Sequence, residues 1–542
     1  MTGASRPGAS LVLRDVRVLS PGIPARRWRG DVAIADGRIA SVHPSSGNAR
    51  SGNASGVRTP AAAEVRDGGG RWLLPAFCDS HLHLHTMAEQ RAVVRLPRRL
   101  GPGELAARLA AAGSPETPGS PRSPAPENAR SAAWIVAQGW ADPLADELTP
   151  SPRAFLDAIH PARPVWAFAY DHHRALLNSA ALSAVGFDPR ASAGVLVEDA
   201  LERAWRRVPP LPAEVAGAVR DLHRLGIAAV TSFDGSAARE RCRRAVEEEG
   251  LRLRLRHSIP LDEFRTRSRA GDLPPPRIDP DAPFLAPWVK LFLDGTLGSH
   301  TAWLGAPYDD LESRGDERIG EMERLALAAE IAESGFGVCL HAIGDAAVRA
   351  AIDFIERLRS ARRGGAVDRI EHCELLDLAD LPRLVRSGAT VSMQPCHLLE
   401  DASVAPERWG SRCRGVFAAR SLLAAGAPLV LGSDAPIETA DPWVDLRAAV
   451  DRRDRAGRFP DGWVREERIS FDEALASRTS RAAAANHLPA GWGRIEPGSP
   501  ADLQLLECDD PAEVTSIEDA GLVGLFVGGE WQDLSGAQGA GR

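Results

Sequence analysis

The sequence predicts an α/β protein built on a (β/α)8 barrel, with a small β-sandwich made from both termini and a lid inserted after the first barrel strand. Three observations support this. The centre of the chain alternates short apolar runs with helical stretches rich in Ala, Leu, Glu and Arg, the pattern of repeated βα units. Both ends carry alternating apolar and polar runs, which indicate antiparallel strands. The length of 542 residues accommodates a barrel with appendages.

The expected boundaries follow from these runs. Residues 1–72 and 483–542 are predicted to form the two parts of the β-sandwich, and residues 73–482 the barrel. The centre holds ten strand-like runs, whereas a closed barrel requires eight. The surplus pair, SAAWIVAQGW and RPVWAFAYDHH, lies between the first run and GIAAVTSFDG. We therefore expect an insertion over about residues 86–215 that serves as a lid.

Composition narrows the class of protein. Hydrophobic residues make up 44% and charged residues 25% of the chain, typical of a globular protein, and no apolar run is long enough for a bilayer. The start lacks a signal-peptide pattern, so a cytoplasmic location is expected. Seven scattered cysteines without CxxC spacing indicate reduced thiols. A net charge of −8 without a single-sign block argues against nucleic acid and leaves a small-molecule substrate, with a homodimer possible.

Candidate metal ligands stand where central apolar runs give way to Gly, Asp or a loop. In DSHLHL, His81 and His83 are two residues apart, so both side chains face one side of a strand. Lys290 in VKLFLDG is the only lysine of the chain. His341 in CLHAIGD, His372 in RIEHCELL and Asp434 in LGSDAP complete the set. Barrel strands deliver such residues to the carboxyl-terminal face, where barrel enzymes work.

Each of these residues has another interpretation when taken alone. The HxH pair can be incidental, and His341 or His372 can be an ordinary buried histidine. Asp434 in SDAP is a reasonable helix cap, and Lys290 can be a surface lysine or an ion-pair partner. Taken together, five strand ends that carry these residue types in order favour a metal site.

The combined motifs resemble the amidohydrolase superfamily, specifically its YtcJ-like branch, amidohydrolase family 3, which includes N-substituted formamide deformylases. The similarity extends over nearly the whole chain through these segments: ADGRIASV, PAFCDSHLHL, YDHHRALLNSAAL, VKLFLDGTLGSHTAWL, HAIGDAAVRAAID, RIEHCELL, SMQPCHLLED, GSDAPIETADPW and GRIEPGSPADLQLLE. The resemblance implies a barrel with a divalent metal centre of one or two ions, with zinc as the expected metal, although imidazole and carboxylate ligands also suit other metals.

The resemblance also implies roles for individual residues. Asp434 is implied as the catalytic residue, and Lys290 as a carboxylated lysine that bridges two metals. The implied metal ligands are His81, His83, Lys290, His341, His372 and Asp434. The substrate-binding candidates are His173, Asn178, His300, Trp303, Gln394 and His397, and His300 stands where the family usually has arginine.

Three functions remain open. The first is a metal-dependent hydrolase that cleaves a C–N bond of an amide, formamide or cyclic amide with a metal-activated hydroxide. The second keeps the metal site but cleaves an ester, lactone or phosphoester. The third is a catalytically silent barrel used as a scaffold, which the complete set of ligand positions disfavours.

Overall fold

The computed structural model describes residues 11–45, 64–97, 99–112, 134–141, 144–169, 174–209, 211–362, 364–532 and 534. The chain divides into two compact units. Residues 1–85 and 219–534 make up the larger unit, and residues 86–218 make up most of the smaller one. The smaller unit is therefore an insertion in the sequence of the larger one.

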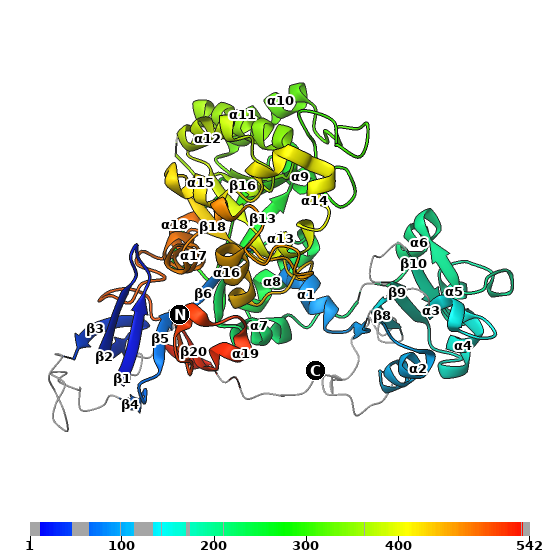
Figure 1. Cartoon of the computed structure of the whole chain (residues 1–542), viewed down its shortest axis with the longest axis horizontal. Helices are drawn as coiled ribbons and strands as arrows, with labels where there is room; N and C mark the ends of the chain where they lie inside the picture. The colour runs from blue at the N-terminus through cyan, green and yellow to red at the C-terminus, as the bar shows by residue number, and fades with distance from the viewer. Residues whose placement is uncertain are drawn as a thin grey trace. The chain divides into compact units, whose positions relative to one another are not determined.

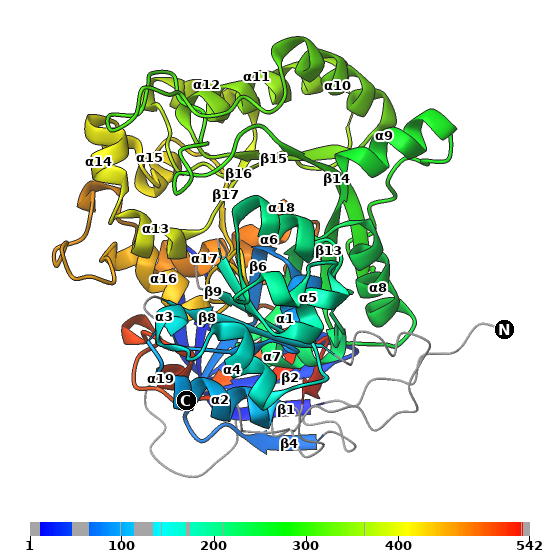
Figure 2. The same cartoon turned by 90° about the vertical axis from the view of Figure 1, so that its right-hand side faces the viewer.

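The larger unit is organised around an eight-stranded parallel sheet whose strands follow one another in chain order (Figure 2). All eight strands correspond to apolar runs in which strands were expected, and the surplus pair of runs lies in the other unit. The predicted (β/α)8 barrel is thus confirmed. The strands are β6 (Phe77–Leu82), β12 (Ile227–Ser232), β13 (Arg254–Pro260), β14 (Phe284–Phe292), β15 (Gly337–Ala342), β16 (Arg369–His372), β17 (Thr390–Met393) and β18 (Leu429–Leu431).

The barrel closes at a seam between β18 and β6. The backbone N–H groups of Ser433 and Asp434 donate to the His81 carbonyl at 3.2 and 2.7 Å, and the His83 N–H donates to the Ala435 carbonyl at 2.8 Å. Gly432 lies at this seam, where an added Cβ would stand 2.5 Å from the backbone nitrogen of His81. Glycine is thus required for this close approach, and the seam joins the segments that carry His81, His83 and Asp434.

Helices surround the barrel, and α10 to α12 lie outside β14 to β16 in Figure 2.

One of these helices, α17, begins with a capping box. The Ser470 hydroxyl accepts from the Glu473 N–H, while the Glu473 carboxylate accepts from the Ser470 N–H. The helices are α1 (Leu84–Gln90), α7 (Val215–Arg224), α8 (Ser236–Glu247), α9 (Leu261–Ala270), α10 (Glu321–Ser334), α11 (Asp345–Ala361), α12 (Leu381–Ser387), α13 (Pro395–Asp401), α14 (Ala405–Trp409), α15 (Ala419–Ala424), α16 (Pro442–Asp451), α17 (Phe471–Arg478), α18 (Ser480–Ala485) and α19 (Ile517–Ala520). Short 3-10 turns span Leu378–Asp380, Gly410–Gly415, Arg465–Glu467 and Pro511–Glu513.

Segments from both ends of the chain form one further sheet in the larger unit, and Figure 1 shows blue N-terminal strands with the red C-terminal β20 beside them. Its order is β21-β20-β19-β5-β1-β2-β3, with β4 paired to β1. Val18, Ile34, Leu73 and Phe526 belong to its buried core. The predicted small β-domain from both termini is confirmed. Its strands are β1 (Leu11–Ser20), β2 (Arg26–Ala35), β3 (Arg38–Pro44), β4 (Glu64–Asp67), β5 (Trp72–Pro75), β19 (Leu503–Leu506), β20 (Leu522–Val527) and β21 (Glu530–Gln532).

Fully hydrogen-bonded charged side chains occupy the amino-terminal end of the barrel, which we call the base. The Arg256 guanidinium is completely buried and donates to carbonyl groups that include those of Ala282, Pro280 and His487. Asp368, also completely buried, accepts from Arg359 at 2.9 Å and from Arg362 at 2.7 and 3.0 Å. These buried ions have the hydrogen bonds that burial requires.

The smaller unit holds a five-stranded sheet of order β11-β10-β9-β8-β7. Leu105, Trp140 and Leu176 belong to one of its two buried clusters, and Trp166 and Leu182 belong to the other. The unit follows the first barrel strand as expected, and its role as a lid stays a prediction. Its elements are β7 (Val94–Arg95), β8 (Ile135–Trp140), β9 (Val165–Ala169), β10 (Arg174–Leu177), β11 (Val195–Val197), α2 (Pro102–Ala111), α3 (Leu144–Glu147), α4 (Pro152–Ile159), α5 (Ser179–Ala184), α6 (Glu198–Trp205) and a 3-10 turn at Pro189–Ala191.

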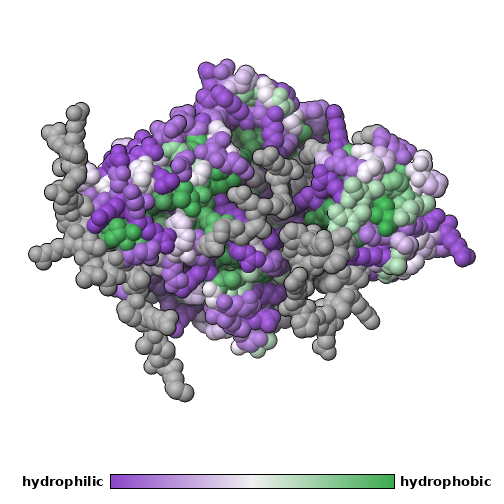
Figure 3. Space-filling model, turned by 90° about the horizontal axis from the view of Figure 1, so that it is seen from below, coloured by the Kyte–Doolittle hydropathy of each residue, from purple (hydrophilic) through white to green (hydrophobic). Residues whose placement is uncertain are grey.

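The surface in Figure 3 is mainly hydrophilic, with apolar side chains gathered in small patches. Among the described helices, none has the length and apolar character needed to cross a membrane. All seven cysteines are free thiols, as expected.

Candidate metal centre

The six predicted metal ligands line a single cavity of about 370 Å³ at the carboxyl-terminal end of the barrel. They come from β6 and the residue after it, from β14, β15 and β16, and from the turn after β18. Strand order thus brings together residues up to 353 positions apart in the chain, from His81 to Asp434. The other lining residues are Phe292, Thr296, Leu297, Gly298, Ile343, Glu374, His397, Asp401 and Ile437.

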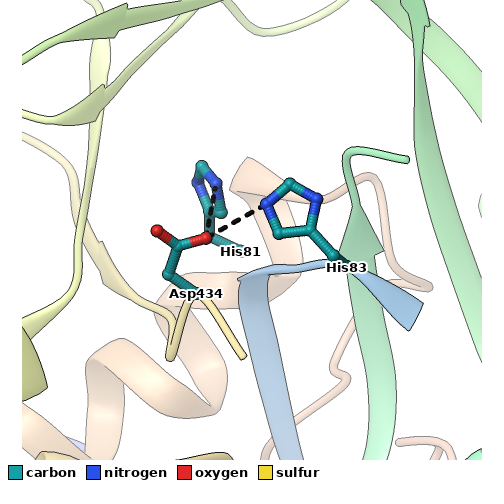
Figure 4. Close-up of side chains that lie close together, drawn as sticks. All are labelled: His81, His83 and Asp434. Carbon is teal, nitrogen blue, oxygen red and sulfur yellow. Dashed lines mark hydrogen bonds and ion pairs between the residues drawn. The ribbon is translucent and has the colours of Figure 1, made fainter. Parts of the chain in front are cut away.

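The Asp434 carboxylate points one oxygen toward both histidines of the HxH pair, as Figure 4 shows. Its Oδ1 is 3.1 Å from His83 Nε2 and 3.6 Å from His81 Nε2. His81 and Asp434 are almost fully buried, whereas His83 is partly exposed to the cavity. The three side chains therefore offer two imidazole nitrogens and one carboxylate oxygen to a common point.

A second group uses the other oxygen of the same carboxylate. Asp434 Oδ2 is 3.3 Å from His397 Nε2, and potential ligand atoms of His372, His397 and Asp434 lie within 4.8 Å of one another. The His341 ring is close to that of His372, with 4.4 Å between centroids. However, His341 Nε2 donates to the Gly295 carbonyl at 3.1 Å, so the free lone pair of His341 is on Nδ1.

This arrangement fits a divalent cation. Ligand atoms about 2.0–2.1 Å from a tetrahedral ion are separated by about 3.3–3.4 Å. The three contacts of Asp434 with His81, His83 and His397 span 3.1 to 3.6 Å and bracket that separation. Nitrogen and carboxylate donors suit zinc and several other first-row metals.

Electrostatics keeps most of the histidines ready to coordinate. Burial lowers the pKa of His81 and of His372, and it lowers the pKa of His341 to about 3. These imidazoles are therefore neutral near pH 7, which is the form that binds metals.

Asp434 and His397 form an ion pair in the absence of a cation. Burial acts to raise the pKa of Asp434, but the neighbouring His81, His397 and His83 hold it well below its usual range. Burial likewise acts to lower the pKa of His397, but Asp434 outweighs it and raises it to about 10. The carboxylate is thus ionised, with the protonated His397 as a counter-charge that a metal ion is able to replace.

Lys290 reaches the cavity from β14 without a hydrogen-bond partner among the described residues. The side chain is almost fully buried, and its Nζ lies 4.4 Å from the ring centre of Phe233 and 5.0 Å from that of Phe292. Burial lowers the pKa of this amine. It is therefore a buried amine without a fixed counter-ion, not a surface lysine.

Two of the ligand candidates stand on unusual backbone. His372 and Asp434 have φ values of 71° and 57°, and Cys373 follows with 51°. Side chains other than glycine seldom adopt this left-handed conformation, and such strain gathers at functional sites. At the end of β16 it turns the chain so that two consecutive side chains, Glu371 and His372, both point inward.

The predicted substrate-binding residues are dispersed. His397 lines the cavity, and Gln394, three residues before it, is buried, with its Nε2 donating to the Ser392 carbonyl. His300 pairs with Asp310 at 2.9 Å, and Trp303 stacks under Arg324; neither belongs to the described lining residues.

Two of the predicted substrate-binding residues, Asn178 and His173, belong to the insertion. Asn178 is completely buried, and its amide caps α5 by accepting from the Ala181 N–H while donating to the His160 and Arg163 carbonyls. This geometry gives Asn178 a role in holding the smaller unit together. His173 lies outside the described residues.

Sequence reasoning missed three carboxylates of this region. Glu371 accepts from His81 Nδ1 at 2.7 Å, and Glu374 and Asp401 line the cavity. Burial raises the pKa of Glu374, and it raises the pKa of Asp401 to about 6. A signal was present for Glu371, because Arg369 precedes it by two residues, and opposite charges on one face of an apolar strand indicate a buried pair.

Comparison with known proteins gives concordant matches. The model of the amidohydrolase family matches residues 64–530. The putative amidohydrolase YtcJ of Bacillus subtilis is 26% identical over 491 residues, covering 83% of this chain and 87% of that protein. The N-substituted formamide deformylase of Arthrobacter pascens is 24% identical over 558 residues, covering 92% and 94%. A crystal structure of a metal-dependent hydrolase from Pyrococcus horikoshii superposes with a TM-score of 0.74 at 25% identity, covering 94% of this chain and 99% of that one.

Proposed function

The chain belongs to the amidohydrolase family and to its YtcJ-like branch, as a metal-dependent hydrolase, and from this premise we propose that it cleaves the carbon–nitrogen bond of a small amide, formamide or cyclic amide. The observation that carries the proposal is the position of Asp434. One carboxylate oxygen faces the HxH pair and the other faces His397, inside a cavity large enough for a small molecule.

The ligand set of the proposed centre is His81, His83, His341, His372 and Asp434, with Lys290 lining the same cavity. A bound divalent cation supplies a water whose pKa is lowered towards ~7 and polarises the carbonyl under attack. Asp434 is placed to take the proton of the attacking water on a carboxylate oxygen and to return it to the departing nitrogen. Water adds across the C–N bond, so the products are an acid and an amine.

We propose that Lys290 carries the carbamate that the family resemblance implies. Its low-pKa amine reacts with CO2 to form an N–C bond and releases one proton, which gives an anion with two oxygens. Arginine is unable to form this group, because its guanidinium stays protonated. The lack of a fixed counter-ion at Nζ supports this proposal, since the carbamate is anionic and needs cations instead.

The relatives support the bond that is cleaved. One of them is named for the deformylation of N-substituted formamides, and we propose zinc as the resident metal on the basis of the mixed imidazole and carboxylate donors.

A substrate panel tests the function. Purified protein is analysed for bound metal and assayed against N-substituted formamides, linear amides and cyclic amides, with esters, lactones and phosphoesters of matched size alongside. We expect C–N hydrolysis that is lost on chelation and regained with zinc. Turnover of esters or phosphoesters alone overturns the assigned bond, and a native protein that binds no metal overturns the metal centre.

A further inference from the structure

Glu371 is a completely buried carboxylate that touches a predicted metal ligand but does not face the cavity. Its Oε2 accepts from His81 Nδ1 at 2.7 Å. The same carboxylate accepts from Arg369 through Nε at 2.8 Å and through Nη2 at 3.2 Å. Glu371 thus joins a ligand of the centre to a buried guanidinium.

Arg369 is in turn fixed by groups from three other segments. Its Nη2 donates to the Ser80 carbonyl at 2.6 Å and to the Ser392 hydroxyl at 3.0 Å, and its Nη1 donates to Asn486 Oδ1. The guanidinium is completely buried. Because its partners come from β6, β17 and the end of α18, its orientation is determined by the packing of the barrel.

Asn486, which is completely buried, anchors this chain of contacts at the end of α18. It follows α18, and its Nδ2 donates to the Ala482 carbonyl at 2.9 Å and to the Ser80 hydroxyl at 3.0 Å. Its Oδ1 also accepts from the Thr231 hydroxyl at 2.7 Å. A continuous set of buried hydrogen bonds therefore runs from α18 through Arg369 and Glu371 to His81.

We propose that Glu371 is a positioning residue for the metal centre: it holds the Nδ1–H of His81 so that the Nε2 lone pair points at the metal. The inference rests on the proposed function insofar as His81 is a ligand. With Nδ1 protonated and bonded, Nε2 is the free nitrogen, and it is the atom that faces Asp434 at 3.6 Å. An anionic acceptor also makes the imidazole a stronger donor to a metal.

The pairing with Arg369 explains why glutamate is needed at this position. Arg369 donates two hydrogen bonds, so both oxygens of residue 371 must accept. Glutamine has one oxygen and an NH2 group, which would face either His81 or the guanidinium as a second donor. Aspartate keeps both oxygens but is one methylene shorter, so it is unable to reach both partners at their present positions.

The test is the affinity of the protein for Zn²⁺, measured by competition with a chromophoric chelator, in wild type, Glu371→Gln and Glu371→Asp. The matched control is Glu467→Gln, the same chemical change at a buried glutamate bonded to the backbone N–H and hydroxyl of Ser421. We expect both Glu371 variants to bind Zn²⁺ about 10–100-fold more weakly and the control to match wild type.

A spectroscopic measurement separates positioning from general damage. Imidazole ¹⁵N shifts of ¹⁵N-histidine-labelled, zinc-loaded protein are expected to show His81 protonated at Nδ1 in wild type. In Glu371→Gln the His81 signal is expected to show that Nδ1 is no longer the protonated nitrogen. Wild-type Zn²⁺ affinity and an unchanged His81 signal in a folded Glu371→Gln protein overturn the inference, as does an equal loss of affinity in Glu467→Gln.

The outcomes also distinguish this inference from the proposed function. A wild-type protein that binds no Zn²⁺ overturns the proposed function. A wild-type protein that binds Zn²⁺ with an affinity that the Glu371 variants share overturns only the role of Glu371. If Glu371→Gln fails to fold, Glu371→Asp decides, since it retains the charge that Arg369 requires.

Discussion

The two ends of the barrel treat buried polar groups in opposite ways. At the base, the Arg256 guanidinium and the Asp368 carboxylate are completely buried and fully hydrogen bonded. At the carboxyl-terminal end, the Lys290 amine and His372 Nδ1 are buried without a hydrogen bond among the described residues. Both pairs of groups are buried and polar, but the Arg256 and Asp368 side chains find their partners within the chain, whereas the Lys290 amine and His372 Nδ1 do not.

This difference indicates what each end is for. A buried polar atom without a partner costs about 1–3 kcal/mol, and a fold retains such atoms where a ligand supplies the missing interaction. The base therefore contributes stability, and the opposite end holds donors for a metal and a substrate, as in other barrel enzymes. Substitutions at the two ends are expected to separate activity from stability.

The largest effect is expected for Asp434→Asn. The amide is unable to accept the proton of the attacking water, so kcat for C–N hydrolysis is expected to fall about 10²–10⁴-fold. Asp380→Asn is the control, because Asp380 is buried and paired with Arg349 outside the cavity. Steady-state assays with zinc-loaded protein check this, and a variant with full activity contradicts the role of Asp434.

Next in size is Asp368→Ala at the base. It leaves the guanidinium groups of Arg359 and Arg362 without their carboxylate, and removing one partner of a buried ion pair costs about 3–5 kcal/mol. Denaturant unfolding of the metal-free protein is expected to show this loss. Zinc affinity below the unfolding transition should match wild type; a selective loss of zinc binding would contradict the division between the two ends.

Lys290→Met is expected to raise the stability of the protein, whereas Asp368→Ala lowers it. Replacing a buried unpaired amine by an apolar side chain removes a desolvation cost of about 1–3 kcal/mol, so the metal-free protein should become more stable while it loses activity. Burial lowers the pKa of Lys290 in the folded state. Between this lowered pKa and the unfolded pKa of about 10.4, the amine is protonated in the unfolded chain but neutral in the folded protein.

The sign of the pH dependence follows. Where the unfolded state binds more protons, stability rises with pH, so wild-type protein should gain stability as pH increases towards the unfolded pKa of Lys290. Thermal unfolding in CO2-free buffer without metal measures this, and the rise should be smaller in Lys290→Met. Equal slopes in both proteins would show that the amine is paired.

The smallest effect is expected at Glu473, on a helix outside the barrel. Burial acts to raise its pKa, but the Arg420 guanidinium and the Ser470 donors outweigh this and lower it to about 2. The stabilisation is therefore complete above an unfolded pKa of about 4.3 and is lost as pH falls towards 2. Glu473→Gln should cost about 1 kcal/mol at pH 7, with a smaller difference from wild type at pH 3 in urea unfolding.

Much of the fold was predictable because barrel strands are buried on both sides and give continuous apolar runs. The eight runs from PAFCDSHLH to PLVLGSDAP were recognised for this reason, and so was the joining of both termini in one β-domain. The candidate ligands that end these runs were singled out by the same logic, and the structure places His81, His83, Lys290, His341, His372 and Asp434 around one cavity.

Other features depend on contacts that a sequence does not reveal. The rule that neighbouring strand residues alternate sides would place Glu371 and His372 on opposite faces, but the left-handed backbone at His372 sends both inward. Asn178 was predicted to bind substrate, yet its amide caps a helix. The contact of His397 with the second oxygen of Asp434 depends on how α13 packs beside the seam.

The glycine at the seam has a consequence for redesign. A methyl group added at Gly432 would stand 2.5 Å from the backbone nitrogen of His81 and 2.8 Å from its Cβ. Gly432→Ala would force apart the two strands whose ends carry the HxH pair and Asp434, widening the spacing between donors without replacing any of them. We therefore expect this substitution to change the ion size that the proposed centre accepts while every ligand stays the same.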